Sequence, residues 1–130
     1  MATWSELTDY VRANFKVADE RPDMMKMIFN TGGLRSQVVL LVRNVLMDGT
    51  EEWVRIESPF AEVAKVDLRV ALEKVGQTVC GGAGLVGDLL TIRHAVPLAN
   101  LDVNELVRPL HLVTTTADRL EKEMIGSDDF

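Results

Sequence analysis

The sequence predicts an α+β fold with the order helix, three-stranded antiparallel meander, helix, one or two strands and long C-terminal helix. Apolar residues recur at spacings of three and four near both ends of the chain, and β-branched residues dominate the segments between them. The chain has 130 residues, 47% hydrophobic and 26% charged, which is typical of one folded domain. We therefore expect a single domain over residues 1–126 and a frayed tail over residues 127–130.

The first helix is predicted over residues 3–15 by an apolar stripe at helical spacing. The stripe consists of Trp4, Leu7, Val11 and Phe15. A polar stretch containing Arg21-Pro22-Asp23 then ends the helical pattern, because proline disfavours helical angles at the residue before it.

Three strands of a meander are predicted next, over residues 24–30, 37–47 and 50–58. The second ends at Asp48-Gly49, a dipeptide favoured in two-residue type I′ hairpins. In the third, Val54 and Ile56 alternate with polar residues and Trp53, so that one face is aliphatic. We expect Pro59 to end this strand, and a helix to cover the aliphatic face.

A second helix is predicted over residues 63–79, before a glycine-rich segment that disfavours helix. Its expected buried side consists of Leu68, Leu72, Val75 and Val79. Residues 81–87 are interpreted as a flexible connector. Residues 85–98 follow as one long strand or two short ones, with Ile92 and His94 on one face and Arg93 on the other.

The last helix has the strongest periodic signal in the chain. Asp102 and Glu105 form a capping-box pattern at its start. Its apolar stripe consists of Leu106, Leu110, Val113, Ala117, Leu120 and Met124. Pro109 inside the helix predicts a kink, and Gly126 is a natural stop.

Charge and cysteine content argue against several classes of function. The net charge of −6 repels nucleic-acid phosphates and anionic lipids, so we expect neither a nucleic-acid nor a membrane partner. Cys80 is the only cysteine, which excludes an intramolecular disulfide and fits a reducing compartment. The chain begins without the pattern of a signal peptide, and a cytoplasmic location is expected.

Several motifs suggest chemistry that their context does not support. Residues 82–87 match the dinucleotide-binding pattern Gly-x-Gly-x-x-Gly, but the predicted helix before and strand after reverse the required order. Cys80 lies at a helix C-terminus, where the dipole disfavours a thiolate, and is interpreted as a small buried hydrophobe. His94 and His111 carry no metal-binding spacing. We expect no cofactor and no metal.

The charged residues likewise predict no enzyme. Paired carboxylates occur where solvent is expected, without the contrast of environments that acid–base catalysis needs. They are Glu51 and Glu52, Glu121 and Glu123, and Asp128 and Asp129. Four arginines fall on or beside the predicted strands, either as an anion- or partner-binding strip or as partners of neighbouring glutamates. These are Arg35, Arg43, Arg55 and Arg93.

Methionines on one short strand suggest a contact with another protein. Met24, Met25 and Met27 occupy both faces of that strand, and one core cannot bury both faces. Core filling is one interpretation, and cover by a dimer partner or a client peptide is the other. The candidate partner-binding residues are Met25, Met27, Trp53, Arg43 and Arg55.

Several stretches together resemble the YbjN-like family, whose fold is shared with type III secretion chaperones. They are residues 37–42, 48–49, 53–59, 90–98 and 117–120. The resemblance implies a helix, three antiparallel strands, a helix, two strands and a last helix, in a unit that often dimerises. Members outside secretion systems are labelled sensory transduction regulators, and the family offers no catalytic residues. Residues 81–87 and Pro109 depart from a dedicated chaperone near the expected dimer contacts.

We therefore expect a non-enzymatic protein- or peptide-binding module, chaperone-like or regulatory, that forms a homodimer. The alternative is a small-ligand sensor that uses the cavity between sheet and helices. Its polar lining would come from His94, Arg93 and Cys80.

Overall fold

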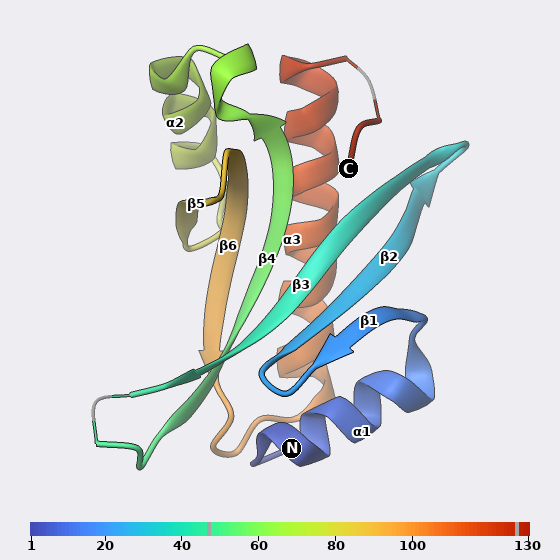
Figure 1. The fold of residues 1–130 in the computed structure, drawn as a ribbon, viewed down its shortest axis with the longest axis vertical. Coiled ribbons are helices and arrows are strands. Elements are labelled where there is room, and N and C mark those ends of the chain that lie inside the picture. Colours follow the sequence, from blue (N-terminus) through green and yellow to red (C-terminus); the bar gives the residue numbers. More distant parts are fainter. Residues whose placement is uncertain (47, 127) are drawn as a thin grey trace.

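The computed structural model describes residues 1–46, 48–126 and 128–130 and shows an α+β fold of two layers (Figure 1). In chain order the elements are α1 (Trp4–Asn14), β1 (Val17–Arg21), β2 (Met24–Gly32), β3 (Arg35–Val45), β4 (Glu52–Glu62), the short 3-10 helix η1 (Val63–Lys65), α2 (Leu68–Gly76), β5 (Gly82–Val86), β6 (Leu89–Pro97) and α3 (Val103–Met124). The strands form one antiparallel sheet in the order β1-β2-β3-β4-β6-β5. The predicted α+β class is confirmed.

The α-helices share one face of the sheet, and α3 extends along most of its length (Figure 1). α3 contacts β2, β3, β4 and β6. α1 contributes Leu7 and Val11 to the same core, and Lys74 Nζ of α2 lies 3.2 Å from Glu123 Oε2 of α3. Sheet and helices thus enclose one core between two layers.

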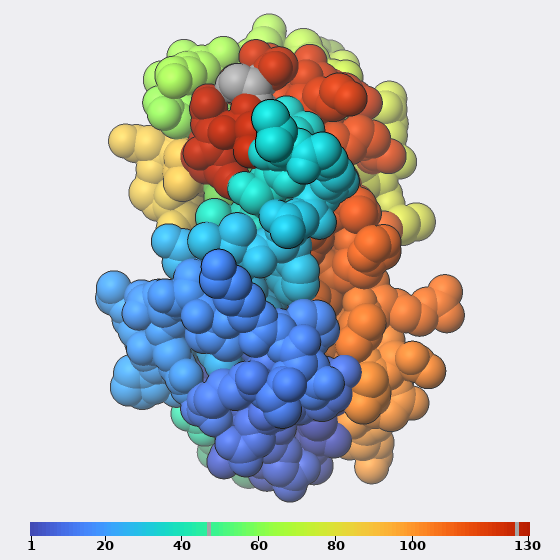
Figure 2. All heavy atoms as spheres, turned by 90° about the vertical axis from the view of Figure 1, so that its right-hand side faces the viewer, coloured from blue at the N-terminus to red at the C-terminus, as the bar shows by residue number. Residues whose placement is uncertain are grey.

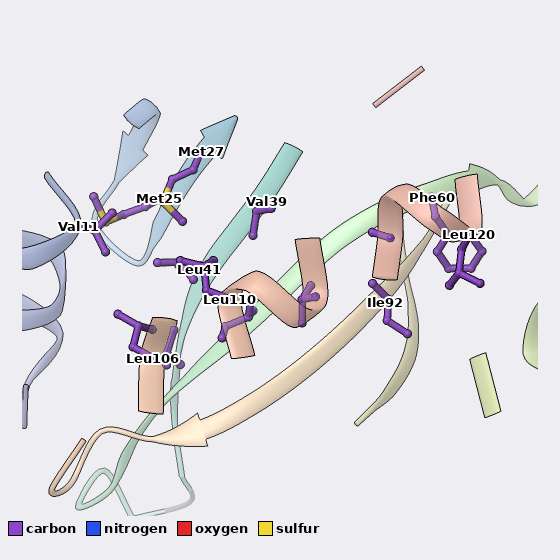
Figure 3. Packing of buried hydrophobic residues seen from close by; sticks show 14 of the residues in the cluster. Val11, Met25, Met27, Val39, Leu41, Phe60, Ile92, Leu106, Leu110 and Leu120 are labelled. Carbon is purple, nitrogen blue, oxygen red and sulfur yellow. The ribbon is translucent and has the colours of Figure 1, made fainter. Parts of the chain in front are cut away.

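Alternate strand residues and one face of α3 build this core (Figure 3). From the sheet come Met25, Met27, Val39, Leu41, Val54, Ile56, Phe60, Leu90 and Ile92, and from α3 come Leu106, Leu110, Val113, Ala117 and Leu120. Met25 and Met27 are both 0% exposed. The interpretation of these two side chains as a partner surface is therefore corrected to core filling, because their face of β2 points toward α1 and α3.

The predictions of the first and the last helix are confirmed. α1 begins after Thr3, whose side chain accepts from the backbone N–H of Glu6. α3 begins at the predicted capping box, in which Asp102 accepts from the backbone N–H of Glu105 at 2.8 Å. Gly126 follows α3 at φ +81°, a left-handed angle that glycine adopts without strain.

The meander has one more strand than predicted. β1 lies at the sheet edge beside β2, in the polar stretch for which no strand was predicted. Four of its five residues are exposed, so its sequence carries no apolar alternation. The turn prediction at Asp48-Gly49 is also corrected, because Leu46 N–H donates to Glu51 across a loop longer than two residues. Met47, at the predicted end of the second strand, lies outside the described residues.

Pro59 does not end β4, which continues to Glu62. The register with β6 shifts between Pro59 and Ala61, and a bulge tolerates a residue that lacks an N–H. The buried side chain of Gln37 donates to the carbonyl of Pro59 and to Ser58 Oγ. This side chain supplies hydrogen bonds where the strand ladder is irregular.

The second helix is shorter than predicted, and its buried side is different. Asp67 caps α2 by accepting from the backbone N–H of Val70. The helix buries Ala71 and Val75, whereas three of the four predicted residues are exposed. Leu68 is 47%, Leu72 50% and Val79 79% exposed. The physical reason is that α2 covers only the end of the sheet near β5, which offers a narrow contact.

The glycine-rich segment forms a strand, not a flexible connector. β5 pairs with β6 over Gly82–Val86, and Gly87 turns the chain at φ +58°. Of the two alternatives predicted for residues 85–98, two strands are correct and one long strand is wrong. The first of them, β5, begins earlier than predicted, at Gly82.

Residues 128–130, which belong to the predicted tail, make hydrogen bonds with α3 and β3, while Ser127 lies outside the described residues. The backbone N–H groups of Asp129 and Phe130 donate to Glu121 Oε2, at 2.6 and 3.0 Å. Asp128 accepts from the backbone N–H of Ser36 at 3.2 Å. The start of β3 and the C-terminal residues consequently lie side by side (Figure 2).

Candidate functional site

The second face of the sheet carries no helix in the described part of the chain, and we call it the open face (Figure 1). Strand alternation places on it an apolar strip formed by Met24, Ile28, Val38, Leu40 and Val42. These side chains are half-buried or, for Ile28, 41% exposed. The strip exists because β2 and β3 are apolar on both faces, although the helices cover only one.

A buried carboxylate lies beside the apolar strip. Glu57 of β4 is 0% exposed, although its face of the sheet is open. Arg55 Nε donates to its Oε1 at 3.2 Å, while Thr91 Oγ1, at 2.6 Å, and Arg93 Nη2 donate to its Oε2. The two guanidinium groups and the hydroxyl therefore satisfy both carboxylate oxygens, as burial of a charge requires.

Gly84 explains how Arg93 reaches Glu57. A Cβ placed at Gly84 would overlap the guanidinium group of Arg93, so a side chain there would displace it. Arg93 lies on β6, next to the edge strand β5, and its Nε is buried. The glycine that resembled part of a nucleotide motif instead provides the space in which this guanidinium lies.

The middle of the open face is positively charged on an acidic protein. Across the strands the register aligns one row of Arg93, Glu57, Leu40, Lys26 and Asp19, and a second of Ala95, Arg55, Val42, Met24 and Arg21. Four cations and two anions give these rows a net charge of +2, against −6 for the chain. Arg21 pairs with Asp19 at 3.5 Å, whereas Lys26 has no ion pair among the described residues.

A hollow of about 310 Å³ adjoins the arginines, and its lining includes Arg55, Arg93, Gly81 and Ala95. Among the described residues, Arg93 Nη1 and Arg55 Nη2 make no hydrogen bond. These N–H groups can donate to an anion, since a guanidinium offers five donors in a planar fork. The arrangement therefore has the donors and the space for a carboxylate.

The helix side has pockets of its own. A cavity of about 310 Å³ between β2 and α3 is lined by Phe15, Phe29, Val107 and His111, among others. Thr31, also in its lining, has a buried Oγ1 without a hydrogen-bond partner among the described residues. A shallower hollow nearby is lined by both His94 and His111, which are far apart in sequence.

The polar lining predicted for this cavity is only partly present. Of the three predicted residues, His94 lines the shallower hollow, while Arg93 faces the opposite side of the sheet. Cys80 packs against the core near Thr116, and burial raises the pKa of its thiol. A raised pKa disfavours the reactive thiolate, in agreement with its interpretation as a structural residue.

The remaining predicted arginines lie away from the open face. Arg43 points to the helix side, where its guanidinium group binds Glu52 at 3.2 Å and Asp23 at 3.3 Å. Its hydrogen bond to Glu52 raises the pKa of Arg43 and lowers the pKa of that carboxyl. Arg35 binds Asp118 at 3.0 Å and Glu121 at 3.3 Å, next to α3. The predicted strip therefore retains Arg55 and Arg93 only.

Of the five candidate partner-binding residues, the structure brings two to the open face. Arg55 lies at its centre. Trp53 lies two residues before it on the same face of β4, and its Nε1 donates to Glu51. The predicted pairing of strand arginines with neighbouring glutamates is confirmed at Glu57, whereas sequence reasoning did not select Thr91. The alternation of Arg55 with Glu57 was a usable signal, but the pairing of β4 with β6 was needed to add Thr91.

An acidic group near the C-terminus is partly paired from within the chain. Carboxylate oxygens of Asp118, Glu121 and Asp128 lie within 4.8 Å of one another. The guanidinium group of Arg35 binds the first two of these residues. Burial raises the pKa of Glu121, and the two backbone N–H donors from the tail oppose this shift.

Comparisons with protein families, curated proteins and solved structures found no match to this chain. Within the described ranges, none of the helices is both long and apolar enough to cross a membrane.

Proposed function

We propose that this protein is a non-enzymatic module that binds an extended protein segment on the open face, as the resemblance to YbjN-like proteins implies. The observation that carries the proposal is the apolar strip from Met24 to Val42, which no helix covers in the described chain. Partly exposed apolar residues gathered on one face are typical of interaction sites. Residues scattered singly over the surface would not support this proposal.

The chemistry of the open face suits binding better than catalysis. Both oxygens of Glu57 accept hydrogen bonds from cationic or hydroxyl donors, so no lone carboxylate is positioned to take a proton. The flanking arginines remain 29% and 30% exposed, which leaves them in contact with solvent and with any partner. A rigid sheet with fixed cations is a preorganised surface, and preorganisation lowers the entropic cost of association.

Substitution of Ile28 tests the proposed surface directly. We expect a displayed library of random peptides to yield ligands for the wild-type protein, and Ile28→Lys to weaken their binding at least about tenfold by placing a charge in the apolar strip. Leu68→Lys on α2 is the matched control, because Leu68 has similar exposure, 47% against 41%. Equal losses in both variants, or a loss in Leu68→Lys alone, would contradict the assignment of the open face.

A second candidate function is a small-ligand sensor that uses the cavity lined by Phe15, Phe29 and His111. The specific observation in its favour is the buried, unpartnered Oγ1 of Thr31 in an apolar lining. In a panel of small aromatic compounds, a ligand of this cavity would raise the melting temperature of the wild type. Val107→Trp, which fills the cavity, would remove that response, and a response that survives it would place the ligand elsewhere.

A further inference from the structure

We propose that the segment bound by the open face is acidic, with one of its carboxylates held between Arg55 and Arg93 and its apolar side chains on Val42 and Met24. This inference rests on the proposed function, and it specifies the chemistry of the partner. The strand register places the charged and the apolar parts of the surface next to each other. Arg55 lies directly beside Val42 on the neighbouring strand, and Val42 lies beside Met24.

The two arginines are arranged to bind more than their own glutamate. Each uses part of its fork on Glu57, and Arg55 Nη1 also donates to Asn44 Oδ1 at 3.4 Å. Arg93 Nη1 and Arg55 Nη2 keep free N–H groups within the described structure. Two guanidinium groups on one carboxylate leave a charge of +1, and an incoming carboxylate neutralises it.

Glu57 has a positioning role in this proposal. Its side chain is 1% exposed, whereas both arginine side chains are close to 30% exposed. The buried anion thus holds the guanidinium groups at the surface and does not occupy their outward side. Gly84 leaves the space for Arg93, and the hydrogen bond to Glu57 restrains that side chain, so it loses less rotamer freedom when it binds.

The distribution of charge favours a short acidic segment over a polyanion. The central rows of the open face carry +2, and the rest of the chain must therefore be strongly negative to give −6. A long phosphate backbone would extend beyond these rows onto acidic surface. A segment with a carboxylate and apolar neighbours matches both the hollow of about 310 Å³ beside the arginines and the adjoining apolar strip.

The test is selection of peptides from a displayed random library, followed by affinity measurement. We expect the wild type to select sequences that combine Asp or Glu with apolar residues. Replacing the acidic residue of a selected peptide by its amide should weaken binding at least about tenfold, through loss of a charge-assisted pair. This substitution leaves the protein unchanged, so folding cannot confound it.

Protein variants locate the effect. Arg55→Gln and Arg93→Gln should lose the preference for acidic over amide peptides, and Gly84→Ala should do the same while keeping both arginines. Arg69→Gln is the control, because Arg69 is an exposed arginine of α2 that pairs with Glu73 at 3.2 Å. A preference that persists in all three open-face variants would overturn the inference.

The outcomes separate this inference from the proposed function. Selected peptides that depend on Ile28 but lack acidic residues would overturn the acidic specificity and leave the binding function standing. Failure to select any peptide would overturn both. Acetate and inorganic phosphate test whether the arginines form only a small-anion site. If either ion perturbs Arg55 and Arg93 to the same extent with and without each acidic peptide, the peptides do not occupy the arginines, and the inference is overturned.

Discussion

At the residue scale, the open face shows how a charge can be buried on a surface that solvent reaches. Glu57 is covered by the side chains of Arg55 and Arg93, which lie on either side of it, and its oxygens are fully hydrogen-bonded. Burial of this kind depends on every partner, since one missing donor leaves a desolvated charge. The burial of Glu57 therefore depends on Arg55, Arg93 and Thr91 as much as on the glutamate itself.

Substitution of Glu57 by glutamine is expected to lower the free energy of unfolding by about 1.5–3 kcal/mol, because two guanidinium groups lose their common anion. Urea denaturation measures this change. Glu73→Gln is the control, as Glu73 pairs with Arg69 but is 62% exposed, and we expect a change within about 0.5 kcal/mol. Equal effects would mean that Glu57 is no more desolvated than a surface glutamate.

Glu121 is expected to make stability depend on pH. Burial raises its pKa in the folded protein above the ordinary value of 4.5, so the folded state binds more protons than the unfolded state just above that pH. Stability contributed by the protonated form is then present below pH 4.5 and is lost as pH rises through the raised pKa. Glu121→Gln should remove this component, measured as the difference from wild type in urea unfolding across that range. A pH-independent difference would contradict it.

At the element scale, local signals and long-range pairing contributed differently to what could be predicted. The capping box at Asp102 and the stripe that includes Leu106 and Leu110 are complete within one segment, and they located α3 correctly. β5 was missed because glycine-rich sequence disfavours a strand, and only the pairing with β6 shows that Arg93 fills the space beside Gly84. The continuation of β4 beyond Pro59 likewise depends on Gln37, from another strand.

The candidate site follows the same division. The alternation of Arg55 and Glu57 was visible along the chain, whereas their meeting with Arg93 required the pairing of β4 with β6. Met25 and Met27 could not be assigned to a face from composition, since Met24 on the same strand does point to the open face. Prediction was therefore reliable where one segment determines the result and unreliable where separate strands must pair.

The helix caps provide a comparison between elements. Asp102→Ala should lower the free energy of unfolding by about 1–2 kcal/mol, because it removes the side-chain cap from the helix that contributes most to the core, although the backbone N–H of residue 102 can still donate to Glu105. Asp67→Ala removes a single cap bond from α2, which buries Ala71 and Val75 only, and about 0.5–1 kcal/mol is expected. Denaturant unfolding of both variants tests the order, and a larger loss in Asp67→Ala would show that α2 is the more important support.

At the scale of the whole molecule, the two faces of the sheet divide stability from recognition. The helix side contains the continuous core, while the open face combines the apolar strip with a net positive centre. The chain as a whole nevertheless carries a net charge of −6, so the surface around that centre is acidic. A partner therefore experiences different electrostatic forces at long and at short range.

This difference predicts an unusual effect of salt on the rate of binding. An acidic peptide at long range is repelled by the net charge of −6, and only near the open face do Arg55, Arg93 and Lys26 attract it. The Debye length falls from about 30 Å at 0.01 M salt to about 10 Å at 0.1 M, so added salt screens the distant repulsion before the contact attraction. The association rate constant, measured by stopped-flow fluorescence, should consequently rise over this range, while the dissociation rate constant rises as contacts weaken. In Arg93→Gln the dissociation rate should be faster and less dependent on salt. An association rate that falls with salt would mean that the positive centre already dominates the field at long range.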